Sequence, residues 1–121
     1  MDLACQHLVA DFWGCRLPES EEGWRQVMRT AVEAMGVTLL RLDVHLFHPQ
    51  GGTAIAMLAE SHLAVHTWPE RDYVAIDVFT CGASVRPDAA IAVLRNELAP
   101  AREHVLQIER GQQVARTVGH Q

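Results

Sequence analysis

The chain has 121 residues, of which 49% are hydrophobic, and this length fits a single domain, 1–121, with a small buried core. A formal net charge of -5 argues against a nucleic-acid-binding surface, and no basic run offers itself to an anionic membrane. The sequence shows neither the pattern of a signal peptide nor an apolar stretch of membrane-spanning length. We therefore expect a cytoplasmic protein.

The three cysteines also indicate the cellular compartment. Cys5, Cys15 and Cys81 are an odd number and form no CxxC pair. Free thiols in a reducing compartment are the better interpretation than a disulfide framework.

The first half of the chain predicts a strand over residues 7 to 13, which stops at Gly14, and then a helix over residues 20 to 35. Apolar residues recur at helical spacing through this helix. Ser20 is the expected N-cap and Gly36 the expected end, whereas Gly23 is a poor helix former near the start.

The second half predicts strands over residues 38 to 47 and 73 to 81, and one long strand or two over residues 53 to 68. A second helix opens at Pro87 and is stopped by Pro100, and a last strand covers residues 105 to 109. The tail after Gly111 is expected to be loosely ordered. This order of elements predicts an α/β (α+β) two-layer sandwich, with a mainly antiparallel sheet and two helices on one face.

Period-two alternation divides the strands into two faces. One face is aliphatic and should meet the helices. The other face collects polar and aromatic residues, namely His45, Phe47, His62, His66, Trp68, Glu70, Asp77, Phe79 and Cys81. Such a face is a ligand site, a subunit interface or both; the alternative is a half-exposed sheet face with incidental polar residues.

Two familiar kinds of site are not supported. His62 and His66 are four residues apart, which on a strand is roughly 13 Å, too far for both to bind one metal ion, so no metal is expected. Ser61 lacks the GxSxG elbow of a serine hydrolase. Taken singly, Cys81 is most simply a buried thiol, and His66 a hydrogen-bonded interior histidine.

Several motifs taken together indicate a more specific function. They are ESH (60–62), HTWPE (66–70) and AIDVFTCG (75–82), with HLVADFWGC (7–15), HLFHPQG (45–51) and HVLQIERG (104–111). In this order and spacing they resemble the bacterial and archaeal S-adenosylmethionine decarboxylase proenzyme family, over about residues 5 to 111.

The resemblance implies self-processing between Glu60 and Ser61. The Ser61 hydroxyl would attack the carbonyl carbon of Glu60, and β-elimination from the resulting ester would leave a β chain, 1–60, and an α chain, 61–121, that begins with a pyruvoyl group. That carbonyl can form a Schiff base with the substrate amine and accept the electrons released by decarboxylation. No external cofactor is then required.

The resemblance also implies roles for individual residues. Cys81 would donate the proton to the substrate carbon, and His66 would act in processing, with Thr53 as a possible aid where the family usually has serine. Glu70 would bind the ribose hydroxyls of the small-molecule substrate, Phe47 would lie in the nucleoside pocket, and Trp68 would be its neighbour. The family's homodimer, in which two sheets pack face to face as an α-β-β-α stack, would cover the mixed face.

Departures from the family pattern keep alternatives open. Cys5 and Gln6 stand where the family has glycine and a basic residue, and Arg71-Asp72-Tyr73 replaces Tyr-Gly-Tyr after Glu70. The leading function is decarboxylation of S-adenosylmethionine, which provides aminopropyl groups for spermidine biosynthesis. The alternatives are a pyruvoyl-dependent decarboxylase of ornithine or arginine, in which Asp72 pairs with the distal cation, and an uncleaved regulatory paralogue.

Overall fold

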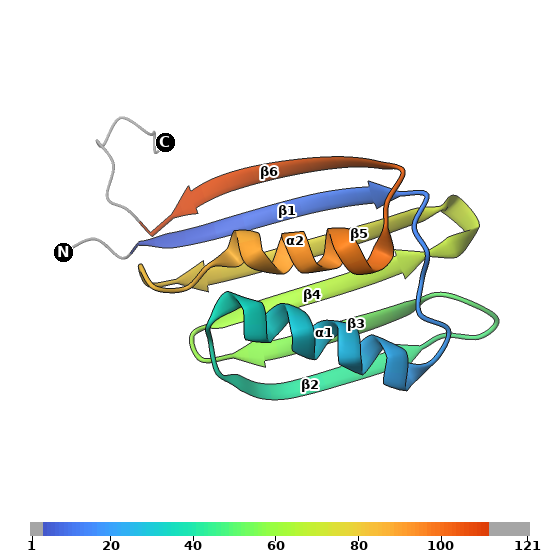
Figure 1. The fold of residues 1–121 in the computed structure, drawn as a ribbon, viewed down its shortest axis with the longest axis horizontal. Coiled ribbons are helices and arrows are strands. Elements are labelled where there is room, and N and C mark those ends of the chain that lie inside the picture. Colours follow the sequence, from blue (N-terminus) through green and yellow to red (C-terminus); the bar gives the residue numbers. More distant parts are fainter. Residues whose placement is uncertain (1–3, 112–121) are drawn as a thin grey trace, which may run out of the picture.

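An antiparallel sheet covered on one face by two helices makes up residues 4–111, the part of the chain that this computed structural model describes (Figure 1). Along the chain the elements are β1 (Cys5–Trp13), α1 (Glu21–Met35), β2 (Leu39–Leu46), β3 (Gly52–Leu58), β4 (Ser61–Trp68), the 3₁₀ helix η1 (Pro69–Arg71), β5 (Tyr73–Cys81), α2 (Pro87–Leu98) and β6 (Arg102–Arg110).

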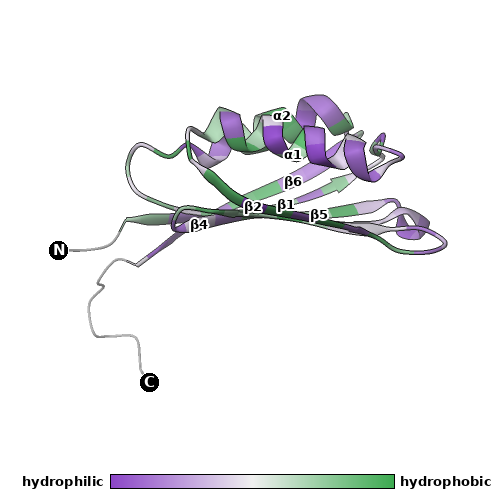
Figure 2. Cartoon of the chain, turned by 90° about the horizontal axis from the view of Figure 1, so that it is seen from below, coloured by the Kyte–Doolittle hydropathy of each residue, from purple (hydrophilic) through white to green (hydrophobic). Residues whose placement is uncertain are grey.

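The strands follow the order β2-β3-β4-β5-β1-β6, and every neighbouring pair is antiparallel. Both helices lie on the same face of the sheet, and the opposite face is left open (Figure 2). The predicted two-layer α+β sandwich is therefore confirmed. Neither helix in residues 4–111 is long and apolar enough to cross a membrane.

The first helix begins and ends where the sequence predicts. The Ser20 side chain accepts a hydrogen bond from the Gly23 amide at 3.0 Å, so Gly23 occupies a capping position where its low helix propensity costs little. Gly36 ends the helix in the left-handed conformation, with φ 75°, and its amide donates to the Glu33 carbonyl.

The core lies between the helices and one face of the sheet. Alternate residues of the four inner strands point into it and are buried, namely Leu8, Ala10, Phe12, Ala54, Ala56, Leu58, Leu63, Val65, Val74, Ile76 and Val78. Trp24, Met28, Met35, Ile91, Leu94 and Leu98 cover them from the helices. The predicted division of the strands into an aliphatic face and a mixed face is confirmed.

The segment 53 to 68 forms two strands. Ala59 and Glu60 make a two-residue turn, so that Leu58 pairs directly with Ser61. Glu60 adopts φ 63°, a left-handed conformation that costs a non-glycine residue roughly 1–2 kcal/mol. The last strand is longer than predicted, and the tail after Gly111 lies outside the described residues.

The cysteines correct the sequence prediction. Cys5 and Cys81 form a disulfide between β1 and β5, so the expectation of free thiols is wrong for these two residues. Cys15 is free and half-buried. The pairing joins positions 76 residues apart, and it depends on the register of β1 against β5, which cysteine spacing does not reveal.

Candidate active site

The open face of the sheet carries the side chains that the sequence singles out. Cross-strand pairs place Thr53 opposite His66, His62 opposite Phe79, and Trp68 opposite Tyr73. Ser61 takes the other orientation, because it alternates with His62 and shares the helix-facing register of Leu63 and Val65.

One end of this face forms a pocket of about 240 Å³. It is lined by Phe47, Gln50, Gly51, Gly52, Thr53, His66, Thr67, Trp68 and Glu70. Five of these were predicted site residues, and we call them the pocket group: Phe47, Thr53, His66, Trp68 and Glu70. They come from β3, β4 and the turns beside them, so the fold brings together side chains spread over 24 positions of the sequence.

A hydrogen bond fixes the histidine of this pocket. The Thr53 hydroxyl and His66 Nδ1 are 3.1 Å apart, and the two residues are direct cross-strand partners. Threonine in place of the family's serine therefore still provides a hydroxyl at the imidazole. The hydrogen bond with Thr53 and the position of His66 on β4 together hold the imidazole over the pocket.

The rings of His66 and Trp68 line the pocket, and Tyr73 supports Trp68 from outside the lining. The His66 and Trp68 rings have centroids 6.2 Å apart, and Trp68 stacks on Tyr73 at 5.5 Å with an interplanar angle of 20°. The Tyr73 hydroxyl donates to the Asp11 carboxylate, and this hydrogen bond is the main reason that the pKa of Tyr73 rises to about 12. The phenol is thus held neutral beside Trp68.

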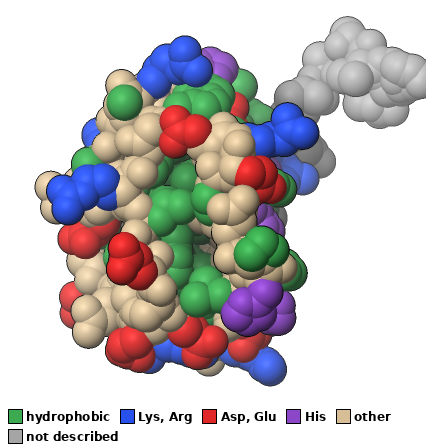
Figure 3. Space-filling view, turned by 90° about the vertical axis from the view of Figure 1, so that its right-hand side faces the viewer, with side chains coloured by type: hydrophobic (Ala, Val, Ile, Leu, Met, Phe, Trp, Pro, Cys, Tyr) green, Lys and Arg blue, Asp and Glu red, His purple; other side chains and the backbone are tan. Residues whose placement is uncertain are grey.

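A second hollow opens on the helix side of the same end. Figure 3 views the molecule from this end and shows hydrophobic side chains at the bottom of the hollow. It has a volume of about 320 Å³ and lies between Trp24, Leu46 and the turn that carries Phe47. Phe47 lines both hollows, and half of its surface is exposed. Its ring therefore separates the open-face pocket from the helix side.

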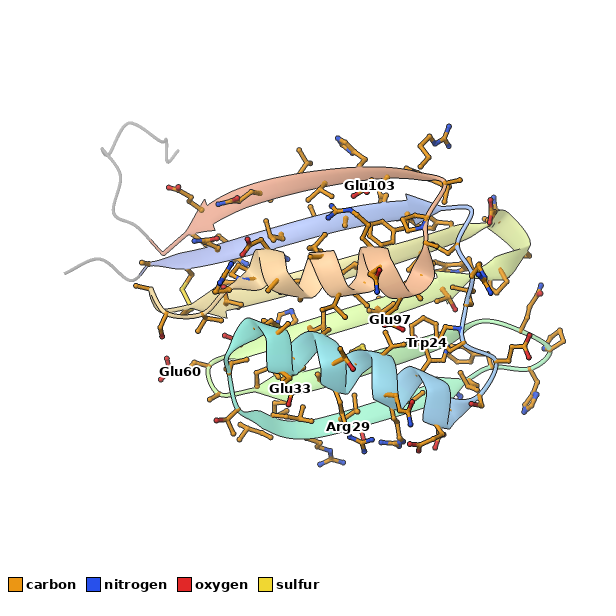
Figure 4. All side chains as sticks on the ribbon, viewed as in Figure 1. Trp24, Arg29, Glu33, Glu60, Glu97 and Glu103 are labelled. Atoms are coloured by element: carbon orange, nitrogen blue, oxygen red, sulfur yellow. A yellow bond between two sulfur atoms is a disulfide. The ribbon has the colours of Figure 1, made fainter. Side chains whose placement is uncertain are left out.

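The predicted cleavage site lies at the opposite end of the sheet. Glu60 is exposed in the β3–β4 turn, and Figure 4 shows it at the left-hand end. Ser61 is buried, and its Oγ accepts a hydrogen bond from the Cys81 amide at 3.4 Å. We call Glu60, Ser61 and Cys81 the cleavage group. The structure therefore brings Ser61 and Cys81 together, while the sulfur of Cys81 is bonded to Cys5.

The two groups are far apart within one chain. His66 follows Ser61 by five residues on the same strand, which corresponds to about 17 Å. Neither Ser61 nor Cys81 is among the residues that line the open-face pocket. One protomer therefore does not bring the predicted histidine to the predicted nucleophile.

Sequence reasoning missed the contribution of β1 to the open face. His7 packs edge-on against Phe79, with its Nε2 3.2 Å from Asp77 Oδ1, and the His62 ring stacks on the other side of Phe79. The alternation of Cys5, His7, Val9, Asp11 and Trp13 against Leu8, Ala10 and Phe12 was the available signal. This alternation does not show that β1 lies beside β5, and that position is what brings its residues to the site.

The two charged residues of the altered loop after Glu70 lie outside the pocket. Arg71 and Asp72 are exposed, and neither is among the residues lining the open-face pocket. Asp72 instead acts on Cys15, since burial and then the charge of Asp72 raise the pKa of that thiol to about 11. Asp72 is therefore not among the side chains that would contact a ligand in this pocket.

Comparisons with known proteins agree with this geometry. The model of the S-adenosylmethionine decarboxylase family matches residues 6–111. The chain is 44% identical over 108 residues to the S-adenosylmethionine decarboxylase proenzyme of Methanococcus vannielii, covering 88% of each chain. It is 45% identical over 107 residues to that of Thermomicrobium roseum, covering 88% of this chain and 92% of the relative.

A solved structure shares the fold. The crystal structure of the adenosylmethionine decarboxylase from Aquifex aeolicus superposes with a TM-score of 0.80 at 28% identity, covering 95% of this chain and 97% of that one. Motifs, fold and relatives thus point the same way, and the chain belongs to the S-adenosylmethionine decarboxylase family.

Proposed function

We propose that this protein is a pyruvoyl-dependent S-adenosylmethionine decarboxylase whose product supplies aminopropyl groups for spermidine biosynthesis. One observation carries the proposal. Five side chains that family resemblance assigns to processing and nucleoside binding line a single pocket, although they come from separate elements.

The proenzyme first cleaves its own chain. The Ser61 hydroxyl attacks the carbonyl carbon of Glu60 and converts the amide to an ester. Elimination of the Glu60 carboxylate then breaks the chain, and loss of ammonia on hydrolysis leaves pyruvate as the first group of the α chain, 61–121. The left-handed conformation of Glu60, with φ 63°, supports this step, because strain at the scissile carbonyl is relieved by cleavage.

The residues around Ser61 fit such a group. The amide of Cys81 donates to Ser61 Oγ, so β5 holds position 61 beside the residue assigned as proton donor. A pyruvoyl carbonyl supplies the electron sink that decarboxylation of an α-amino acid needs. The Cys81 thiol then delivers a proton to the substrate carbon after carbon dioxide leaves.

The pocket group suits the substrate. Glu70 offers two acceptor oxygens to the ribose hydroxyls. The exposed rings of Phe47 and Trp68 provide faces for the adenine base. The same rings attract the positively charged sulfonium centre through cation–π interactions.

A homodimer completes the site in this proposal. Six large apolar side chains stand exposed on or beside the open face, namely Phe47, Ile55, Met57, Trp68, Leu106 and Ile108. An exposed apolar surface of this kind favours burial against a partner. Face-to-face packing of two sheets as an α-β-β-α stack would set the pocket group of one protomer against the cleavage group of the other.

This assignment places the enzyme in the cytoplasm. Turnover requires Cys81 as a thiol, and a reducing compartment keeps thiols reduced. The partners are then the small-molecule substrate and a second copy of the chain.

The alternative substrates have weaker support. A basic amino acid would need a carboxylate for its distal cation, but Asp72 does not line the pocket, and Glu70, which does, is assigned to the ribose hydroxyls. An uncleaved regulatory paralogue would have no need of Ser61, His66 and Cys81 together.

The test is release of carbon dioxide by the reduced enzyme from S-adenosylmethionine, ornithine and arginine in parallel. We expect turnover with S-adenosylmethionine alone. Glu70→Gln should raise its KM about tenfold or more, equivalent to about 1.4 kcal/mol of binding. Preference for ornithine or arginine would overturn the substrate, and release from none of the three would overturn the proposed function.

A further inference from the structure

The disulfide joins the start of β1 to the end of β5. Figure 4 shows it at the same end of the molecule as Glu60. It therefore occupies the sulfur that the proposed function assigns to proton donation. A disulfide sulfur carries no hydrogen, so the bonded form of Cys81 has no proton to give.

The backbone positions these two cysteines for each other. Cys5 and Cys81 are direct cross-strand partners with Cα atoms 4.1 Å apart. The Gly82 amide donates to the Ala4 carbonyl, whereas the Cys81 amide points to Ser61 on the other side. The pair thus occupies a non-hydrogen-bonded site of the ladder, where opposed side chains approach most closely.

The two sulfurs differ in their access to solvent. Cys81 is half-buried, whereas Cys5 is 3% exposed. Arg110 is the cross-strand partner of Cys5, and its guanidinium lies over Phe79, two residues before Cys81. A positive charge at this end of the sheet favours the reactive thiolate. Cys15, with its pKa raised to about 11, is a poor competitor for exchange.

We propose that Cys5 and Cys81 are a redox-active thiol pair, and that their oxidation to a disulfide reversibly stops decarboxylation. The proposal rests on the proposed function, because it requires Cys81 as the proton donor. Cys5 takes no part in the reaction itself. Its role is to capture the Cys81 sulfur under oxidising conditions and to release it when a dithiol is present.

The reactants are a low-molecular-weight disulfide and the two thiols. The Cys81 thiolate attacks one sulfur of the external disulfide, forms a mixed disulfide and expels one thiolate. The Cys5 thiolate then attacks the Cys81 sulfur, forms the protein disulfide and expels the second thiolate. The two protons that the cysteine thiols lose pass to the two released thiolates; the cysteines lose two electrons, and the external disulfide gains them. A dithiol reverses both steps.

Self-cleavage gives this switch a readout that is independent of activity. Cleavage between residues 60 and 61 puts Cys5 on the β chain and Cys81 on the α chain. Oxidation therefore joins the two chains covalently, and reduction separates them. Intact mass under non-reducing conditions reports the state of the pair.

The experiment equilibrates the cleaved enzyme with dithiothreitol or with its cyclic disulfide. The cyclic reagent is chosen because it does not stay attached to a lone cysteine. The second thiol of the bound reagent closes the ring again and releases the cysteine. For the wild type we expect linked chains in the oxidised reagent and a loss of carbon dioxide release from S-adenosylmethionine of about 100-fold or more, as for loss of a general acid. Dithiothreitol should restore both separate chains and turnover.

Two variants serve as controls. Cys5→Ala, or Cys5→Ser if the alanine variant does not fold, should keep its chains separate and its turnover unchanged in both reagents. Cys15→Ala should behave as the wild type. Linked wild-type chains with full turnover would refute the switch, as would wild-type chains that never link or a Cys5→Ala enzyme that is inhibited equally. A reduced enzyme without cleavage or turnover would instead refute the proposed function, and the switch with it.

Discussion

Thr53 and His66 show how one hydrogen bond sets the chemistry of a pocket residue. Their 3.1 Å contact joins two strands across the open face, and it engages Nδ1 rather than Nε2 of the imidazole. If His66 acts in processing as proposed, the hydroxyl of Thr53 should matter more than the size of its side chain.

Thr53→Val should slow cleavage about tenfold, because it removes this hydroxyl while keeping the branched shape, a loss of about 1.4 kcal/mol. Thr53→Ser keeps the hydroxyl and should cleave at close to the wild-type rate. The measurement is the rate of appearance of the two chains after synthesis. Equal rates for Thr53→Val and the wild type would remove Thr53 from processing.

Tyr73 links the pocket wall to β1 through Asp11. The pKa of Tyr73 is raised to about 12, so the folded state favours the protonated phenol more than the unfolded chain does. The stabilisation is therefore complete below pH 10 and is lost as the pH rises toward 12.

Tyr73→Phe should lower the free energy of unfolding by about 1 kcal/mol below pH 10. The difference from the wild type should shrink between pH 10 and pH 12, and urea unfolding of both proteins across this range measures it. A difference that does not change with pH would show that the hydrogen bond to Asp11 contributes nothing.

Much of the site was predictable residue by residue, but its arrangement was not. The motifs gave Ser61, His66 and Cys81, and alternation placed most of the pocket group on one face. The strand length that argues against a His62–His66 metal pair also separates Ser61 from His66. Motif matching alone does not reveal the distance between Ser61 and His66.

At the level of elements, local signals predicted the fold well. Capping residues, helical periodicity and proline stops placed α1 and α2 within a residue or two of their observed ends. Alternation does not show which strands are neighbours, so the place of β1 between β5 and β6 came only from the structure. The Cys5–Cys81 disulfide requires β1 to lie beside β5, so the sequence alone did not predict it.

Two glycines with nearly the same backbone conformation give a test of packing between elements. Gly14, after β1, has φ +73°, and a Cβ there would lie 2.7 Å from Ala101 Cβ. Gly36, after α1, has φ +75° and would meet nothing within 4 Å.

Gly36→Ala should cost about 1 kcal/mol for the left-handed conformation alone. Gly14→Ala should cost a further 1 to 3 kcal/mol, roughly the price of overpacking. Urea unfolding of the two variants gives the difference directly. Equal losses would mean that the contact between Gly14 and Ala101 is easily relaxed.

For the whole molecule, the separation of the two groups makes the dimer central. If each site combines the pocket group of one protomer with the cleavage group of the other, then two inactive variants should complement each other. Ser61→Ala lacks the nucleophile but keeps its pocket, and His66→Ala lacks the histidine but keeps Ser61.

Co-expression should therefore yield cleavage of His66→Ala chains, while each variant alone stays uncleaved. Tags of different mass on the two chains identify which one is cut. A mixture that forms dimers without any cleavage would contradict a shared site.

The most direct test of the account is the intact mass of the reduced wild-type protein after expression. We expect two fragments that divide the chain between Glu60 and Ser61, the second bearing a pyruvoyl group in place of serine, and a Ser61→Ala variant that stays whole. A wild type that remains one chain of 13.4 kDa would contradict self-processing, and with it the decarboxylase proposed here.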